Sequence, residues 1–167
     1  MIQKATIDSI REDDLVPLLR KLVAALAAKS SQPDSRDYVL FVVVDLINRI
    51  GSIATFHEHE RALFAELNLR AGTKAVAVPD FAGAAMYAEN GIALLSDTCW
   101  KTQYDLSLQL HEIAVLSHFS NRTGDQALLT NRINTVFERA RTFSDKFNTH
   151  RIWTRLLSLS NFPRAIE

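Results

Sequence analysis

Apolar residues recur every three or four positions along most of the chain, which is the spacing of one face of an α-helix. The first such stretch begins after Asp13 and Asp14, either of which can cap a helix, and it ends in the polar, proline-containing loop of residues 30–34. Its predicted buried stripe consists of leucines: Leu15, Leu18, Leu19, Leu22 and Leu26.

The second stretch ends at Gly51, a natural helix C-cap. Residues 39–44 are rich in β-branched side chains, so by propensity alone they also fit a buried strand. No other segment offers a partner strand, and we therefore expect a helix. Its predicted inward face consists of Val39, Val42, Val43, Leu46 and Ile50.

A third helix is expected over residues 58–74, with Glu60, Glu66 and Arg70 outward and Leu63, Phe64, Leu67 and Ala71 inward. Pro79 and Asp80 open a fourth, whose stripe contains several alanines: Phe81, Ala84, Ala85, Ala88, Ile92 and Leu95. Small side chains let two helix backbones approach closely, so the third and fourth helices are predicted to form a tight antiparallel hairpin.

Three further helices complete the pattern. Residues 96–98 can cap a fifth, which runs to about His118 and is apolar on more than one side, as in a helix packed between others. The sixth starts after Gly124-Asp125 and carries one long stripe: Leu129, Ile133, Val136, Ala140, Phe143 and Phe147. Residues 149–160 form a seventh, and residues 161–166 resemble the start of an eighth, so we expect either a chain truncated at its C-terminus or a terminal helix that frays.

The predicted fold class is therefore all-α, with antiparallel helical hairpins stacked as a degenerate TPR-like solenoid. TPR repeats have a period of about 34 residues. Here Ala127 and Ala165 lie 38 residues apart, each shortly after a turn, and the spacing of Phe81, Ala84, Tyr87 and Gly91 resembles the second helix of a TPR unit.

Several ordered strings carry a more specific resemblance: ELNLRAG-x-KA at 66–75, AA-x-Y-x-x-x-G-x-x-LL at 84–95, W-x-x-x-YDL at 100–106, LHE at 110–112 and AR-x-x-x-DK at 140–146, followed by Arg151-Ile152. They resemble the helical region downstream of the AAA-type ATPase module in large multidomain sensor kinases. Those proteins combine serine/threonine-kinase-like, ATPase, GAF and histidine-kinase domains. The resemblance covers residues 58–167, is weaker over 37–57 and is absent from 1–36.

This resemblance implies a non-catalytic scaffold or protein-interaction module that positions neighbouring domains and relays signals between them. It divides the chain into an N-terminal helix and linker, residues 1–36, and a helical array, residues 37–167. The chain has no phosphate-binding glycine loop, kinase catalytic loop or histidine-kinase glycine box, so the enzymatic activities of such proteins are not transferred to it. We expect no cofactor.

Composition narrows the function classes further. The chain has 19 basic and 19 acidic residues, so no overall field attracts nucleic acid or an anionic membrane. A single cysteine excludes an internal disulfide and agrees with a reducing compartment, and no apolar run approaches the roughly 20 residues of a membrane span. With no secretory signal at the N-terminus, the expected location is cytoplasmic.

Histidines supply the candidate chemistry. His57 and His59 are two residues apart, about 200° around a helix, whereas a zinc-protease helix needs histidines four apart on one face. His111 and His118 share a face, but each is predicted to be a buried or interfacial histidine with a hydrogen-bond partner. The competing interpretation is a small all-helical enzyme or metal-binding protein that uses His57, His59 or His111.

The C-terminal end is the predicted partner-binding surface. In a solenoid, a terminal unit without a polar cap leaves its apolar stripe in water. The side chains expected to be uncovered there are Trp153, Leu156, Leu159 and Phe162. Such a patch favours a protein partner, either a flanking domain, a peptide segment or a second copy in a homodimer.

Overall fold

The computed structural model describes residues 17, 21, 36–50, 56–121 and 125–161, and every regular element in these ranges is a helix. The expected all-helical class is thereby confirmed. The chain divides into two compact units, residues 1–57 and 58–167. Of the predicted first helix, only Pro17 and Lys21 lie within the described residues, and both are helical.

In the first unit, α3 spans Arg36–Ile50, so helix is confirmed over strand. The predicted inward face is partly wrong, because Val39 and Val42 are 38% and 39% exposed. The buried side chains of Leu40, Val43, Val44 and Ile47 instead follow the i, i+3, i+4, i+7 pattern of one helix face. Leu46 is buried beside them. The segment is apolar on several sides, so the spacing of its apolar residues is compatible with more than one buried face. The side chain of Ile50 lies outside the described residues.

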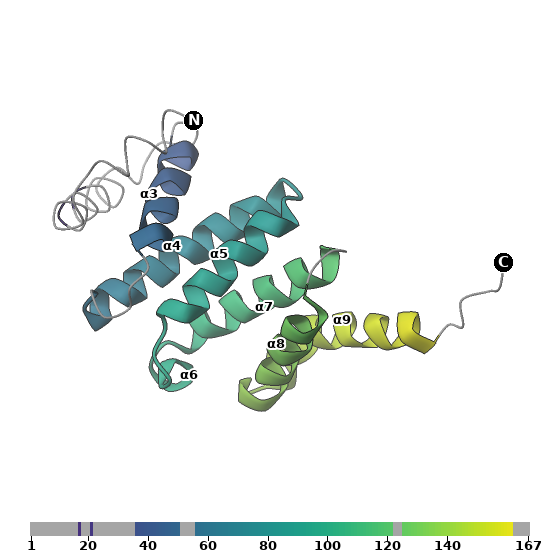
Figure 1. Ribbon diagram of the computed structural model, residues 1–167. Coiled ribbons are helices and arrows are strands. Elements are labelled where there is room, and N and C mark those ends of the chain that lie inside the picture. The colour runs from purple at the N-terminus through teal and green to yellow at the C-terminus, as the bar shows by residue number, and fades with distance from the viewer. Residues whose placement is uncertain (1–16, 18–20, 22–35, 51–55, 122–124, 162–167) are drawn as a thin grey trace. The chain divides into compact units, whose positions relative to one another are not determined.

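The second unit contains α4 (Glu58–Ala77), α5 (Phe81–Leu94), α6 (Cys99–Thr102), α7 (Tyr104–Ser120), α8 (Gln126–Arg139) and α9 (Phe143–Asn161), as Figure 1 shows. The helices α4 and α5 lie side by side as an antiparallel hairpin. Asp80 is the N-cap of α5, as expected, and its Oδ1 accepts a hydrogen bond from the Gly83 backbone N–H at 2.9 Å.

Small residues line the contact between α4 and α5. Ala84 and Ala88 are fully buried, and a Cβ atom added to Gly72 would lie 3.6 Å from the Ala84 carbonyl oxygen. The predicted close hairpin is therefore confirmed. On α4 the predicted faces need two corrections, since Leu63 is 39% exposed and Glu60 is buried at 8%. The buried face of α4 is centred on Phe64, Leu67, Asn68 and Ala71, with Leu63 at its margin.

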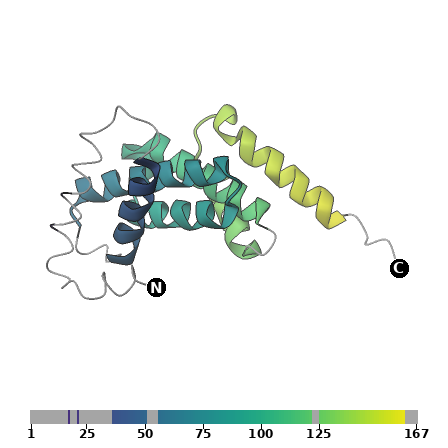
Figure 2. The ribbon, with the colours of Figure 1, turned by 90° about the horizontal axis from the view of Figure 1, so that it is seen from above.

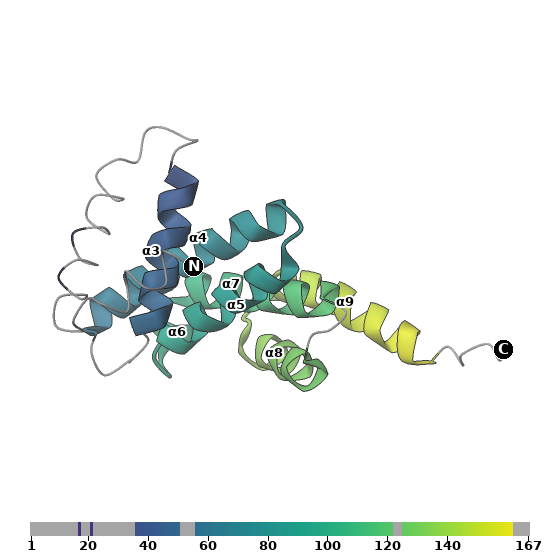
Figure 3. The same ribbon diagram turned by 45° about the horizontal axis from the view of Figure 1, so that its top comes forward.

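The predicted single helix from residue 98 to 118 is wrong, because Gln103 separates the short α6 from α7. Thr98 makes no capping hydrogen bond through its side chain. The interruption leaves the Trp100 carbonyl to accept a hydrogen bond from the Arg141 guanidinium at 3.3 Å, a contact that comes from a distant part of the chain. The helix α7 packs against α4, α5, α8 and α9, so its predicted position between other helices is confirmed (Figure 3).

The predicted continuous helix through Phe147 is also wrong. The helix α8 ends at Arg139, with Ala140 as its C-cap, and α9 begins at Phe143, leaving Phe143 and Phe147 71% and 51% exposed. The new helix starts with a reciprocal cap: the Thr142 backbone N–H donates to the Asp145 carboxylate at 3.1 Å, and the Asp145 N–H donates to the Thr142 hydroxyl at 3.2 Å. This Thr-x-x-Asp capping signal was present in the sequence, but the regular apolar spacing across it predicted a continuous helix.

Three buried side chains, Val115, Leu129 and Ile133, form a core cluster where α7 and α8 meet. Trp153 and Leu156 of α9 are half-buried against this cluster, so the prediction that both are uncovered is wrong. Beyond them α9 extends away from the other helices of its unit (Figure 2), and Leu159 is 66% exposed, as expected. Phe162 lies outside the described residues.

Within the described ranges, none of the helices combines the length and the hydropathy that a membrane span requires.

Candidate protein-binding groove

A groove of about 610 Å³ lies in the second unit, bounded by α4, α7 and α9. It arises because α7 contacts both α4 and α9, while α5 and α8 take other sides of α7. The residues that line it come from all three helices: Leu69, Thr73, Val76, Gln109, Glu112, Ile113, Leu116, Phe119, Ser120, Asn148, Thr149, Arg151, Ile152 and Arg155.

The groove has an apolar floor. Its apolar lining side chains are half-buried rather than fully covered, which leaves carbon surface for an occupant: Leu69, Val76, Ile113, Leu116, Phe119 and Ile152. Phe119 and Ile152 also pack against the core cluster, so the floor is continuous with the folded interior. Pockets with an apolar floor and a few polar groups at the edge are the usual form of a binding site.

The polar lining is unevenly charged. Arg151 and Arg155 are exposed on consecutive turns of α9, and neither guanidinium group makes an ion pair or hydrogen bond with another described residue. The carboxylate of Glu112 accepts a hydrogen bond from the Asn148 amide at 3.1 Å. Within the part of the chain that the structure describes, the two guanidinium groups are therefore the charges of the groove that have no partner.

Thr149 lies at the base of the groove and is 1% exposed. Its hydroxyl has no hydrogen-bond partner among the described residues. A buried hydroxyl without a partner is unfavourable by roughly 1–3 kcal/mol, so the Thr149 hydroxyl lowers the stability of the fold.

Replacing Thr149 by valine is expected to raise the free energy of unfolding by about 1 kcal/mol, since the variant keeps the shape and removes the unpaired hydroxyl. Urea unfolding measures the change. Thr154→Val on the same helix is the control, because the Thr154 hydroxyl is exposed and donates to the His150 carbonyl, and there we expect almost no change. A loss of stability in Thr149→Val would mean that its hydroxyl is already satisfied.

A cluster around Tyr104 fixes the start of α9 and hence the position of the groove wall. The Tyr104 hydroxyl donates to the Asp145 carboxylate at 2.6 Å and accepts from the Arg141 backbone N–H at 2.8 Å. The Arg141 guanidinium stacks over the Tyr104 ring, 4.0 Å from its centre. The hydrogen bond from Tyr104 is the main cause that lowers the pKa of Asp145, which keeps this carboxylate ionised as the cap of α9.

A second polar cluster joins α5, α7 and α8. The Glu89 carboxylate receives hydrogen bonds from the guanidinium of Arg132, one of them at 3.0 Å, and lies 3.0 Å from His118 Nε2. Burial alone would raise the pKa of Glu89, but the hydrogen bonds from Arg132 and His118 outweigh it and hold that pKa below its ordinary value. The groups are mutually satisfied, so this cluster is structural.

His111 is buried, and its Nδ1–H donates to the Ser107 carbonyl at 2.8 Å. Its ring also lies 5.1 Å from the centre of the Trp100 ring. With His118 bonded to Glu89, the expectation of two partnered histidines at helix interfaces is confirmed. Burial lowers the pKa of His111, and the hydrogen bond to Ser107 offsets only part of that effect.

This shift predicts acid sensitivity. The folded state favours neutral His111, whereas an unfolded imidazole takes up a proton near pH 6.5, so the contribution of His111 is complete above that pH and decreases as the pH falls. We expect the free energy of unfolding to drop with a slope of up to about 1.4 kcal/mol per pH unit below pH 6.5. Urea titrations of the wild type and His111→Asn from pH 7 to pH 5 test it. Equal slopes in the two proteins would contradict the assignment.

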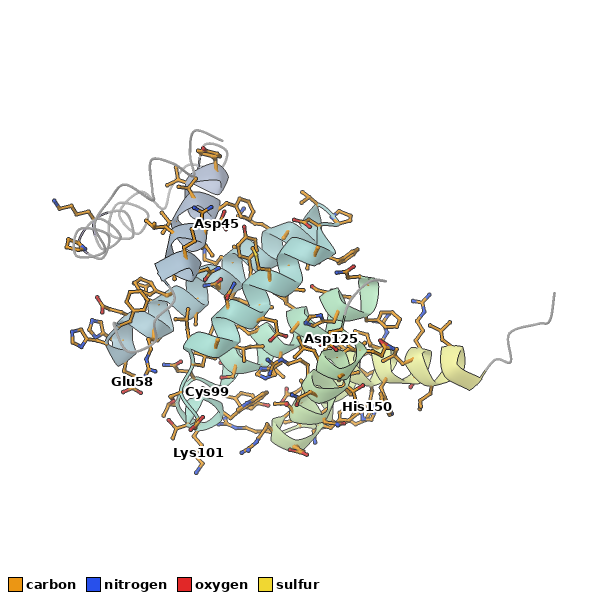
Figure 4. All side chains as sticks on the ribbon, in the orientation of Figure 1. Asp45, Glu58, Cys99, Lys101, Asp125 and His150 are labelled. Atoms are coloured by element: carbon orange, nitrogen blue, oxygen red, sulfur yellow. The ribbon has the colours of Figure 1, made fainter. Side chains whose placement is uncertain are left out.

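The other candidate histidines are exposed: His57 directly precedes α4, and His59 lies in its first turn. In the part of the chain that the structure describes, no group of three or more His, Cys, Asp or Glu side chains is arranged to hold a metal ion. His111 is engaged in the core, and Cys99, at the start of α6 in Figure 4, is buried. The described residues bring none of these side chains together into a catalytic or metal site.

Sequence reasoning missed the groove. The partner-binding residues predicted from the sequence, Trp153, Leu156, Leu159 and Phe162, do not line this groove, whose α9 wall carries Arg151, Ile152 and Arg155. The available signal was the second apolar face of α7, which carries Ile113 and Leu116 and was interpreted only as packing between helices.

Comparisons of the chain with protein-family models, with curated proteins and with solved structures gave no significant match.

Proposed function

We propose that this chain is a non-catalytic helical scaffold whose groove between α4, α7 and α9 binds a peptide segment of a partner protein. The observation that carries the proposal is the groove itself. It combines a half-buried apolar floor with two exposed arginines whose guanidinium groups have no partner among the described residues. The apolar floor and the arginines are both improved by an occupant, and neither is arranged for bond chemistry.

The order of helix contacts supports a TPR-like arrangement for the second unit. The helix α4 packs on α5, α5 on α7, and α7 on α8, while α4, α7 and α9 also contact along a second path. In stacked helical hairpins the first helices of successive hairpins adjoin one another and form one common face. With α4, α7 and α9 as those first helices, the groove lies on that face, which is where solenoids bind extended partners.

The wider role follows from the sequence resemblance. We propose that the chain acts in the cytoplasm as the helical region of a multidomain ATPase or kinase signalling protein, where it positions flanking domains and relays between them. The strings at residues 66–75, 84–95 and 100–112 support this assignment. Self-association through the end of α9 stays a prediction, supported by the 43% and 66% exposure of Leu157 and Leu159.

A steric block tests the groove. Random 16-residue peptides displayed on phage are selected against the full chain, and the enriched peptides are measured by fluorescence anisotropy. Thr73 is exposed on the α4 wall, so Thr73→Trp should fill the groove and weaken binding by about tenfold or more. Ala93→Trp is the control, because Ala93 is exposed on α5 and does not line the groove.

Enriched peptides whose affinity falls in Thr73→Trp and not in Ala93→Trp would support the proposed function. A selection without enrichment, or peptides that bind the two variants equally well, would show that the groove is not a peptide site.

A further inference from the structure

We propose that the groove selects an acidic peptide, with carboxylates for Arg151 and Arg155 and apolar side chains for the floor beneath them. This inference rests on the proposed function, because it names the chemistry of the segment that the groove binds. Neither the net charge of the chain nor the family resemblance suggests it. It depends on which charges remain unpaired after the helices have packed.

The α9 wall of the groove carries a pair of positive charges. Arg151 and Arg155 are four residues apart on α9, so their backbones are separated by about 6 Å along the helix axis and both side chains point to the same side. Elsewhere in the same unit the arginines with structural roles are engaged: Arg132 with Glu89, and Arg141 with Tyr104 and Trp100. Two adjacent, exposed guanidinium groups that no described residue pairs with favour carboxylate partners, which they can bind in bidentate fashion.

The acidic side of the groove lies on α7. Glu112 is the carboxylate among the lining residues, and it lies on α7 with the Asn148 amide bonded to it. Asn148 therefore satisfies part of the hydrogen-bonding capacity of Glu112 and leaves the α9 wall positive. A basic peptide would face two arginines there, whereas an acidic peptide would face one partly satisfied carboxylate.

The apolar floor of the groove requires apolar side chains in the ligand. Carboxylates alone would leave Ile113, Leu116 and Ile152 in contact with water, and an exposed arginine pair by itself contributes little affinity. Apolar side chains placed next to the acidic ones would cover this floor and reduce solvent around the ion pairs, which strengthens them. The ligand that fits is therefore acidic and apolar together, and not a free anion.

The experiment uses the random peptides selected above on the full chain. We expect the enriched sequences to contain more Asp and Glu than the starting library, next to large apolar residues. Arg151→Glu combined with Arg155→Glu should weaken their binding by about tenfold or more, and raising NaCl should weaken it in the wild type. The matched control is Arg139→Glu, an exposed arginine at the end of α8 that does not line the groove. Both arginines are exposed, so the double variant is expected to fold, and urea unfolding checks that it does.

Two kinds of failure are distinguishable. Peptides that are blocked by Thr73→Trp but are neutral or basic, or that bind the arginine double variant as well as the wild type, would overturn this inference and leave the peptide groove intact. Peptides that are insensitive to Thr73→Trp, or no enrichment at all, would overturn the proposed function and this inference with it.

Discussion

Replacing Gly91 by leucine is expected to lower the free energy of unfolding by about 3 kcal/mol. Gly91 lies on α5 where α4, α5 and α7 meet. Even a Cβ atom there would lie 2.6 Å from Leu110 Cδ2 and 3.2 Å from Asn68 Cβ. Leu110 and Asn68 are both fully buried, so neither can move aside without disturbing the packing of its own helix.

Urea unfolding followed by circular dichroism measures this effect. Ala93→Leu places the same side chain two residues further along α5, where residue 93 is exposed, and there we expect a change below about 0.5 kcal/mol. Similar midpoints for the two variants would mean that the three helices do not approach as closely at Gly91 as described.

Replacing Glu89 by alanine is expected to destabilise the second unit by about 2 kcal/mol. The side chains of Glu89, Arg132 and His118 are only 22%, 18% and 9% exposed, so removing the carboxylate leaves a cation and an imidazole without their acceptor. The carboxylate also joins α5 to a side chain of α7 and a side chain of α8. This expected destabilisation is smaller than that for breaking a fully buried ion pair, because these groups keep some contact with water.

A double-mutant cycle with Arg132→Ala isolates the interaction. We expect the double variant to be less destabilised than the sum of the single variants by about 1 kcal/mol or more, because the second substitution removes a group that the first left unpaired. Strict additivity would show that Glu89 and Arg132 do not depend on each other. Since the folded state holds Glu89 ionised, its contribution should disappear as the pH falls below about 4.5.

Local features of the sequence were sufficient for the helical class and for several boundaries. The caps at Asp80 and Asp125 act through hydrogen bonds to backbone N–H groups two or three residues ahead, so the residues that decide them are adjacent in the chain. Figure 4 labels Asp125 at the start of α8. The close contact of α4 and α5 was predictable for a similar reason, because alanines at helical spacing permit it whatever the rest of the fold does.

The boundaries that sequence reasoning missed depend on residues distant in the chain. The interruption at Gln103 and the new start at Thr142 are held together by Tyr104, Arg141 and Asp145, whose contacts span about 40 positions. Apolar spacing continued across residues 140–147 and predicted one helix, because periodicity records only which residues share a face if the helix continues. The long-range hydrogen bonds decide that it does not continue.

The sequence by itself therefore determined that the chain is helical, where most helices begin, and that α4 and α5 pack closely. The tertiary structure alone decided which face of α3 is buried, that Trp153 and Leu156 belong to a core margin, and that Arg151 and Arg155 lie exposed beside an apolar groove. The physical reason is that a helix and its caps are stabilised by neighbours within about four residues, whereas a groove exists only in the space that three separately formed helices leave between them.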